Sequence, residues 1–373
     1  MAEKIRVGLI GVNASTGSWG ARSHVPALKA LREYELRAVC TAHDETAREA
    51  AGAFGAPLAF SDYRALAAEP SVDLVVVSVR VPYHREIVLA ALAAGKATFC
   101  EWPLGANLVE AEEMAAAARQ RGVRTMIGLQ GRSDPSVRYV RDLVAGGYLG
   151  RVLACHLAVI GSTGSIERPS SRAWAADRRN GVGTLAIQGG HTLDTFCYAL
   201  GELAELSAVV ATQVNRWRIS DTGETIDVTS PDTVLLNGRL ESGALVAAHV
   251  GSVPYNGSGA RLEVYGTEGT LILTAAGGFN IGPIAVYGAQ GGATPAELTI
   301  PAHYVLAPEG TPAGTPFNVA QAYARYADSL QAGERLDADF ELAVARHRLL
   351  DAIQRSSEEG RAVRPEQQRS VPA

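Results

Sequence analysis

Lysine is scarce in this sequence, because only three of its 34 basic residues are lysine. They stand at positions 4, 29 and 96, so a catalytic task that a lysine usually performs further along must fall to another side chain. Positive charge is not in excess either, since 39 acidic residues give a formal net charge of −5. A nucleic-acid-binding surface needs clustered positive charge. The sequence therefore predicts no nucleic-acid partner.

Cysteines and long apolar runs are also few. The four cysteines, at positions 40, 100, 155 and 197, lie far apart within apolar segments and lack metal-ligand spacing. This pattern predicts buried, reduced thiols and no metal site. No apolar stretch reaches the roughly 20 residues that cross a bilayer, and the first apolar run opens into a glycine loop instead of a signal peptide. A cytoplasmic protein without a membrane partner is expected.

The chain of 373 residues is too long for one ordinary core, so two domains are expected. Its first third alternates short apolar runs with helical patterns, and those runs are almost continuously apolar. Such strands are typical of a parallel sheet that helices cover on both faces. An α/β domain with a doubly wound, Rossmann-type sheet is predicted over residues 1–130.

The pattern changes after about residue 150. Strand candidates now alternate polar and apolar residues and come in hairpin-like pairs with turn residues between them. We expect an α+β domain over residues 131–360 with an open-faced, mostly antiparallel sheet, followed by a polar tail at 361–373. The expected helices cover residues 134–146, 190–200, 317–332 and 339–357. Self-association through the open sheet face, giving a homo-oligomer, is expected.

Glycines mark the end of the first strand, in "GLIGVNASTGSWG". Gly8 and Gly11 stand where the chain must turn tightly and where a phosphate could approach the backbone. The next helix offers free N–H groups and the positive end of its dipole to that phosphate. The spacing is not a strict GxGxxG, because Asn13 occupies the place of a turn glycine. At the start of a βαβ series the segment predicts a dinucleotide site.

The end of the second strand bears on the type of nicotinamide cofactor. An acidic side chain there would bind the ribose 2′-hydroxyl of NAD. In "AVCTAHDET" the place is taken by Thr41, with His43 close by and Arg48 on the next helix. A neutral hydroxyl followed by cations can accept the 2′-phosphate of NADP, whereas Asp44, one step further on, argues for NAD or for a helix cap. NADP is the preferred prediction and NAD the alternative.

A third segment, "NGVGTLAIQGGHTLD", is dense in glycine and leads into an apolar helix that carries His191 and Asp194. The two side chains are three residues apart and share a helical face, so a histidine–carboxylate pair for proton transfer is one interpretation. An imidazole ordinarily titrates near pH 6.5, which suits that task. A buried, hydrogen-bonded structural histidine is the other interpretation. Both stay open on these residues.

Four segments together resemble the glucose–fructose oxidoreductase/inositol dehydrogenase/MocA (Gfo/Idh/MocA) family. They are "GLIGVN", "VPYHREIVLAALAAGKATFCEWPL", "GYLGRVL" and "GVGTLAIQGGHTLD". The resemblance implies a hydride transfer between NAD(P) and a hydroxyl carbon of a sugar or cyclitol. It also implies a set of cofactor contacts: Gly8, Ile10, Gly11, Val12, Asn13, Ala14, Thr41, His43, Ser78, Val79, Arg80, His84, Glu101, Trp102, Pro103 and Gln130. The substrate contacts expected with them are Trp102, Arg132, Trp174, His191 and Tyr255.

The chain departs from the family pattern at two places. The family's Glu-Lys-Pro loop reads Glu101-Trp102-Pro103 here, and the aspartate usual four residues before the histidine is Ile187. The branch with the fungal galactose-pathway repressor is similar in these departures. The resemblance also predicts a cis Trp102–Pro103 peptide. It leaves two functions open: an oxidoreductase in which His191, oriented by Asp194, transfers the proton, or a non-catalytic NAD(P)-binding regulator.

Overall fold

The computed structural model describes residues 4–14 and 17–365, and the chain divides into two compact units. The first comprises Met1–Ser133 and Val305–Val344, and the second comprises Asp134–Tyr304 and Ala345–Ala373. Of the predicted polar tail at 361–373, residues 366–373 lie outside the described residues. No helix in the described part of the chain is long and apolar enough to cross a membrane.

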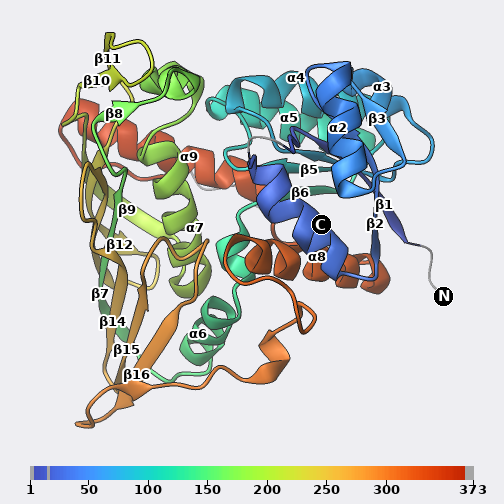
Figure 1. Cartoon of the computed structure of the whole chain (residues 1–373). Coiled ribbons are helices and arrows are strands. Elements are labelled where there is room, and N and C mark those ends of the chain that lie inside the picture. Colours follow the sequence, from blue (N-terminus) through green and yellow to red (C-terminus); the bar gives the residue numbers. More distant parts are fainter. Residues whose placement is uncertain (1–3, 15–16, 366–373) are drawn as a thin grey trace. The chain divides into compact units, whose positions relative to one another are not determined.

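The first unit contains a six-stranded sheet in the order β3-β2-β1-β4-β5-β6 (Figure 1). Every neighbouring pair is parallel. This is the predicted doubly wound Rossmann topology, and the chain reverses its direction of winding between β1 and β4. The strands are β1 (Ile5–Ile10), β2 (Tyr34–Cys40), β3 (Leu58–Phe60), β4 (Leu74–Val77), β5 (Ala97–Glu101) and β6 (Thr125–Gly128).

Helices cover both faces of this sheet, with α4 and α5 above it and α1 and α8 below it in Figure 1. Helix α5 shows why they form: the Asn107 side chain accepts a hydrogen bond from Glu110 N at its start, and Gly122 ends it in the left-handed conformation. The helices are η1 (Gly20–His24), α1 (Val25–Ala30), α2 (Asp44–Phe54), α3 (Tyr63–Ala68), η2 (Val81–Tyr83), α4 (His84–Ala93), α5 (Leu108–Arg121), η3 (Gln130–Ser133) and α8 (Thr315–Ala332).

Helix α8 belongs to the first unit, which differs from the predicted contiguous domain of residues 131–360. Its Tyr323 is completely buried, and the ring packs edge-on against Phe99 of β5 and against His24. Tyr34 of β2 donates a hydrogen bond to the Tyr323 carbonyl at 2.7 Å. These contacts, made by residues about 200 to 300 positions away in sequence, decide the assignment, and the local pattern of α8 carries no sign of them.

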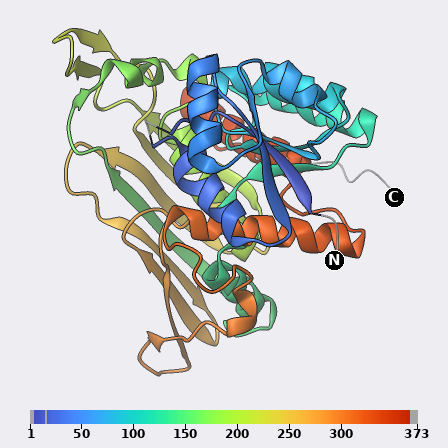
Figure 2. The same cartoon turned by 45° about the vertical axis from the view of Figure 1, so that its right-hand side comes forward.

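The second unit is built on an eight-stranded sheet in the order β17-β16-β15-β14-β7-β13-β12-β9 (Figures 1 and 2). Its pairs are antiparallel except β7 with β13, so the predicted mostly antiparallel sheet is confirmed. The strands are β7 (Val152–Ser162), β9 (Leu203–Ala211), β12 (Thr233–Leu240), β13 (Leu245–Val253), β14 (Gly259–Gly266), β15 (Gly269–Ala275), β16 (Ala285–Gln290) and β17 (Ala296–Glu297).

One side of the large sheet carries exposed apolar side chains on four strands. They are Val209, Leu235, Leu245 and Tyr265, each at least 40% exposed. In these strands they alternate with buried residues, as in a half-covered sheet. The helices of this unit are α6 (Pro135–Ala145), the π-helical turn η6 (Leu185–Gly189), α7 (Gly190–Leu200), and α9 (Phe340–Glu359) from Ala345 onward.

A small three-stranded sheet, in the order β11-β10-β8, was not predicted. Its strands are β8 (Glu167–Arg168), β10 (Arg216–Ile219) and β11 (Thr225–Asp227). Each has four residues or fewer, which is too short for a period-two pattern to be visible in the sequence. Two short 3-10 turns, η4 (Ser170–Ala176) and η5 (Arg178–Asn180), follow β8 along the chain.

Candidate functional site

The first part of the site is the crevice where the order of the parallel strands reverses. Gly11 follows β1 with φ at 90°, and a Cβ there would lie 2.3 Å from the backbone oxygen of Ser78, which follows β4. A side chain at position 11 is therefore excluded, because the ends of the two strands approach too closely. In doubly wound sheets a ligand binds in this crevice beyond the carboxyl ends of the strands.

Two further glycines, Gly8 and Gly20, allow neighbouring segments to pack closely. Gly8 lies inside β1, where a Cβ would come within 2.7 Å of Leu66. The prediction that Gly8 belongs to the phosphate-binding turn is therefore wrong. Its missing side chain makes room for α3 to pack on the strand. Gly20, which sequence reasoning missed, opens η1, and a Cβ there would lie 3.3 Å from the Gly11 oxygen. This close packing of helix on loop is the role of the third glycine in a dinucleotide fingerprint.

Two buried polar atoms at the same sheet edge find no hydrogen-bond partner among the residues that the structure describes. They are the Ser78 hydroxyl, after β4, and the Gln130 amide oxygen, after β6. Buried polar groups in proteins are normally hydrogen-bonded. The closely approached glycine turn and these two atoms therefore fit a polar, phosphate-bearing ligand such as a nicotinamide dinucleotide.

The end of β2 presents hydroxyl groups. The Thr41 hydroxyl donates to the His43 carbonyl at 3.0 Å and lies 2.6 Å from the Thr46 hydroxyl. Asp44 is the first residue of α2, so its carboxylate lies in the first turn of that helix, where the helix dipole favours negative charge. His43 and Asp44 are both exposed.

The Trp102–Pro103 peptide is cis, as predicted. The ring nitrogens of His84 lie 2.9 Å from the Pro103 carbonyl and 3.1 Å from the Val79 carbonyl, so this histidine ties the loop after β5 to the loop after β4. Burial lowers the pKa of His84. Trp102 itself is 4% exposed, which places the indole inside the unit and not on its surface.

Glu101 is held by a buried histidine that sequence reasoning missed. His24 Nε2 lies 2.9 Å from Glu101 Oε1, and His24 Nδ1 lies 2.8 Å from the Tyr323 hydroxyl. The Glu101 carboxylate also lies over Gly128, where a Cβ would come within 2.8 Å of it. The position of the Glu101 carboxylate is thus fixed by His24, which the Tyr323 hydroxyl of α8 holds in turn, and by close packing against Gly128 of β6. The only sequence signal was the histidine beside the apolar run "VPALKAL".

Arg132, an expected substrate contact, is buried in η3 of the first unit. Its Nη1 donates to Asp337 at 3.3 Å, and Arg325 of α8 donates to the other oxygen of the same carboxylate at 2.7 Å. Arg132 and Arg325 therefore share one carboxylate within the first unit, that of Asp337, which stands just before α9.

In the second unit, His191 lies at the start of α7, directly after the π-helical turn η6. Single π-helical turns inside helices occur frequently at functional sites. His191 is 9% exposed and Asp194 is 1% exposed. The Asp194 carboxylate accepts a hydrogen bond from Arg346 Nε at 2.9 Å, and Arg346 also pairs with Glu202. Asp194 therefore balances a buried arginine, whatever it does for His191.

This pairing leads to a stability prediction. Asp194→Asn leaves the charge of the 3%-exposed Arg346 side chain with Glu202 alone, so the free energy of unfolding should fall by about 3 kcal/mol. The matched control is Asp351→Asn, which removes an exposed partner of Arg355 and should cost under about 1 kcal/mol. Urea unfolding curves measure both. Equal midpoints for the two variants would contradict the proposed weight of the Arg346 pair.

A cavity of about 740 Å³ lies in the second unit, and we call it the larger cavity. A chain of polar groups lines it: Thr184 donates to Ser252 at 3.0 Å, and Ser252 donates to the Gln188 amide oxygen at 3.1 Å. The remaining lining residues are Thr163, Ser165, Glu167, Arg168, Pro169, Arg172, Trp174, Ala175, Val182, Gly183, Ile187, Val214, Trp217, Val228, Ser230, Pro231, Asp232 and Pro254.

The structure thus brings the expected contact Trp174 and the departure Ile187 into one cavity. Ile187 stands four residues before His191, which is not among the described residues that line the cavity. Tyr255, another expected contact, follows the lining residue Pro254 but is 62% exposed. Sequence reasoning missed Gln188 and Ser252, whose hydroxyl and amide groups can bind the hydroxyls of a polyol.

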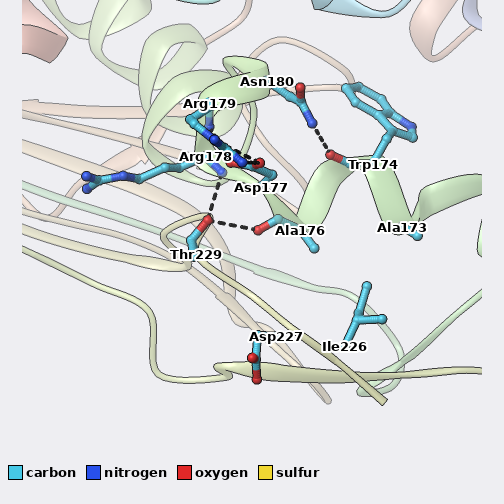
Figure 3. A pocket seen from close by; sticks show the side chains of 10 residues that line it. All are labelled: Ala173, Trp174, Ala176, Asp177, Arg178, Arg179, Asn180, Ile226, Asp227 and Thr229. Atoms are coloured by element: carbon cyan, nitrogen blue, oxygen red, sulfur yellow. Dashed lines mark hydrogen bonds and ion pairs between the residues drawn. The ribbon is translucent and has the colours of Figure 1, made fainter. Parts of the chain in front are cut away.

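A smaller cavity of about 420 Å³ shares Trp174 with the larger one (Figure 3). Hydrogen bonds shape its wall: Asn180 donates to the Trp174 carbonyl at 2.5 Å, and Arg178 N donates to the Thr229 hydroxyl at 3.0 Å. Arg179 and Asp177 form a bidentate ion pair, in which Arg179 Nε donates to Asp177 Oδ1 at 3.1 Å and Arg179 Nη2 donates to Asp177 Oδ2 at 2.6 Å. That pair cancels one positive and one negative charge at this cavity.

Comparison with known proteins now places the chain. Residues 5–129 match a model described as an oxidoreductase family with an NAD-binding Rossmann fold. The dehydrogenase aclE of Aspergillus oryzae is 35% identical over 249 residues, which cover 64% of this chain and 68% of that protein. The chain belongs to the Gfo/Idh/MocA family. Its first unit therefore carries this family's NAD-binding domain, which the crevice beside Gly11 fits.

Within the Gfo/Idh/MocA family, the second half of the chain matches a model described as the Gal80p C-terminal domain, over residues 135–275. The galactose/lactose metabolism regulatory protein GAL80 of Saccharomyces cerevisiae is 29% identical over 298 residues, 74% of this chain and 68% of that protein. A solved levoglucosan dehydrogenase, in complex with NADH and levoglucosan, has a TM-score of 0.84 at 22% identity and covers 98% of this chain and 100% of its own. The predicted position near the galactose-repressor branch is thus confirmed.

Proposed function

We propose that this protein is an NAD(P)-dependent oxidoreductase that acts on a hydroxyl or keto carbon of a sugar, cyclitol or related polyol. The observation that carries the proposal is the larger cavity, which is lined by the Thr184–Ser252–Gln188 chain and whose residue Gln188 stands three positions before His191 in the sequence. Hydroxyl and amide groups of this kind bind sugar hydroxyls, and a histidine is the commonest residue for proton transfer. The dehydrogenase aclE and levoglucosan dehydrogenase, both similar to this chain, support the reaction class.

In this proposal His191 accepts the proton of the reacting hydroxyl, or returns it to a carbonyl in the reverse direction. A bound nicotinamide dinucleotide supplies the partner for the hydride. Asp194, anchored by Arg346 at 2.9 Å, orients the helix that carries His191. Trp102 and Ile187 are apolar and transfer no proton. The polar cavity wall positions the substrate, and positioning supplies much of the rate of such reactions.

The test is a screen of sugars, cyclitols and polyols with NAD and with NADP, in which the absorbance of the nicotinamide reports turnover. Oxidation of one of them at a rate that saturates with substrate is the expected result. The screen should include the corresponding ketoses with NADH and NADPH, because the direction of transfer is part of the question. Absence of turnover in both directions, with dinucleotide binding intact, would remove the enzyme proposal.

A second function is favoured by specific observations. The usual lysine and aspartate positions hold Trp102 and Ile187, and the similarity to GAL80 covers 74% of this chain. A non-catalytic NAD(P)-binding regulator is therefore the alternative. It is favoured if dinucleotide or sugar changes the association of the protein with a partner protein while no substrate is turned over.

Within the proposed function, NADP is the preferred cofactor. The end of β2 carries the hydroxyls of Thr41 and Thr46 where NAD-specific proteins place an acid. Thr41→Asp should therefore weaken NADP binding by about tenfold or more through repulsion of the 2′-phosphate, with NAD binding affected less. Thr41→Asn is the uncharged control. Calorimetric titration of both cofactors measures this, and a native protein that binds NAD as tightly as NADP would contradict the preference.

We also propose that the exposed side of the large sheet joins two copies of the chain. Val209 and Leu245 are 57% and 52% exposed, and two more apolar side chains, Leu235 and Tyr265, share this face of the sheet. Contiguous apolar surface of this kind marks interaction sites. The mass in solution, measured by light scattering, should be at least twice the 39.2 kDa of one chain, and a monomer would contradict the proposal.

A further inference from the structure

The larger cavity carries an uncompensated positive charge. Its lining includes two acidic side chains, and, among the residues that the structure describes, neither forms an ion pair with an arginine of the lining. The Asp232 carboxylate accepts hydrogen bonds from Gln213 N at 3.0 Å, Val214 N at 2.7 Å and the Thr233 hydroxyl at 2.9 Å. The Glu167 carboxylate lies 3.5 Å from Arg218 Nη1. The Asp232 carboxylate keeps its charge, because its hydrogen-bond donors are neutral, but one carboxylate offsets at most one of the two arginines of the lining.

Two arginines of the lining, Arg168 and Arg172, form what we call the arginine pair. The Arg168 guanidinium lies 5.1 Å above the Trp217 ring and donates to the Glu167 carbonyl at 2.7 Å and to the Ser165 carbonyl. Carbonyl groups orient a guanidinium but do not cancel its charge. In the part of the chain that the structure describes, neither arginine of the pair forms an ion pair with a carboxylate.

The Arg168 guanidinium is held in place by the carbonyls of Ser165 and Glu167, and its charge interacts with that of Arg172. Burial lowers the pKa of Arg168, and the neighbouring charge of Arg172 lowers it further. Arg168 is half-buried in the short strand β8, whereas Arg172 is exposed in the turn η4. Two like charges on one cavity wall repel each other unless an anion lies between them. Guanidinium groups bind carboxylate and phosphate oxygens in a bidentate manner.

We propose that the arginine pair binds the oxyanion group of a small ligand, and that the substrate is a polyol with a carboxylate or phosphate, such as a sugar acid or sugar phosphate. The cavity volume of about 740 Å³ suits one small molecule. Thr184, Gln188 and Ser252 bind the hydroxyls of the polyol, and the arginines bind its charged end. The substrate assignment rests on the proposed function, whereas the anion site does not.

The experiment is calorimetric titration of the full chain with glucuronate, glucose-6-phosphate and glucose. The anionic ligands should bind at least about tenfold more tightly than glucose, and added salt should weaken them selectively. Arg172→Gln should weaken the binding of the tighter-binding anion by about tenfold and leave the affinity for glucose unchanged. Arg172→Lys keeps the positive charge but lacks the two parallel N–H donors of a guanidinium, so it should retain part of the preference for the anions over glucose. Glucuronate and glucose-6-phosphate distinguish a carboxylate site from a phosphate site.

Arg216→Gln is the matched control, because Arg216 lies on β10 of the same small sheet but lines neither cavity. It should bind all three ligands like the native protein. Glucose bound as tightly as the anions, or Arg172→Gln indistinguishable from the control, would overturn the anion site. Binding of an acidic peptide, but of none of the three sugars, would also overturn it and indicate a protein partner.

Absorbance assays with the same variants separate this proposal from the proposed function. Arginine-dependent binding of an anion without any turnover would leave the anion site intact and remove the enzyme. Turnover of neutral polyols that Arg172→Gln does not change would keep the enzyme and remove the anionic substrate class. Turnover of a sugar acid that falls in Arg172→Gln through a higher KM supports both.

Discussion

Gly11→Val is expected to abolish dinucleotide binding, with a loss of more than about 100-fold in affinity. The first atom of the new side chain would already lie 2.3 Å from the Ser78 backbone oxygen, and the φ of 90° is unfavourable for a branched residue. The ends of β1 and β4 would have to separate. That movement displaces the turn that a pyrophosphate must approach, so binding is lost even where the sheet survives.

The matched control is Gly52→Val in α2, where a Cβ meets nothing within 4 Å. It should leave cofactor affinity unchanged, because the position lies on an exposed helix face. Calorimetric titration with NAD and NADP measures binding, and circular dichroism with thermal unfolding shows whether each variant is folded. A folded Gly11→Val protein with native affinity would show that the dinucleotide binds elsewhere.

The second large effect is expected at His191. His191→Ala should lower kcat by about 100-fold or more, since it removes the group proposed to transfer the proton. Dinucleotide binding should stay within about twofold, because the Rossmann crevice belongs to the first unit. His191→Gln keeps a polar side chain that does not titrate, and it should be as inactive as the alanine variant.

His303→Ala is the control, because His303 is exposed in the short turn η7 (Ala302–Tyr304). It should turn over substrate like the native protein. The pH profile provides a readout that a structural defect does not imitate: a limb of the native kcat/KM profile should disappear in any residual activity of His191→Gln. Native rates in His191→Ala, for a substrate found in the screen, would assign the proton transfer to another residue.

The sequence predicted the parts of the fold that repeat a pattern over many residues. Five of the six parallel strands, the β12–β13 and β14–β15 hairpins and the four later helices lie where alternation and periodicity put them. Strands β3 and β8 were missed because two or three residues show no period. Helix α8 was found but assigned to the wrong partner, since its burial depends on Phe99 and other residues far away in sequence.

The candidate site divides in the same way. Gly11, Thr41 and the Glu101-Trp102-Pro103 loop were predicted because a strand end and a family motif mark them. His24 was missed, because its contact with Glu101 joins residues 77 positions apart. The segment "ERPSSRAW" was one of the loops that could face a substrate, but nothing in it indicates that Glu167 is paired with Arg218 while Arg168 and Arg172 form no ion pair with a carboxylate of the described chain. Charge compensation is a property of the folded chain.

The discontinuity of the first unit affects its synthesis. The last strand of its sheet ends at Gly128. Tyr323, which packs against His24 and Phe99, belongs to α8, and that helix begins only at Thr315. The chain between Gly128 and Thr315 forms the whole large sheet of the other unit. Domains usually fold as they leave the ribosome, beginning with the N-terminal one. Here the cofactor-binding unit completes its core only after α8, which ends at Ala332, has been translated. All strands of the large sheet in the second unit are translated before that helix, so they can begin to fold while the core of the first unit is still incomplete.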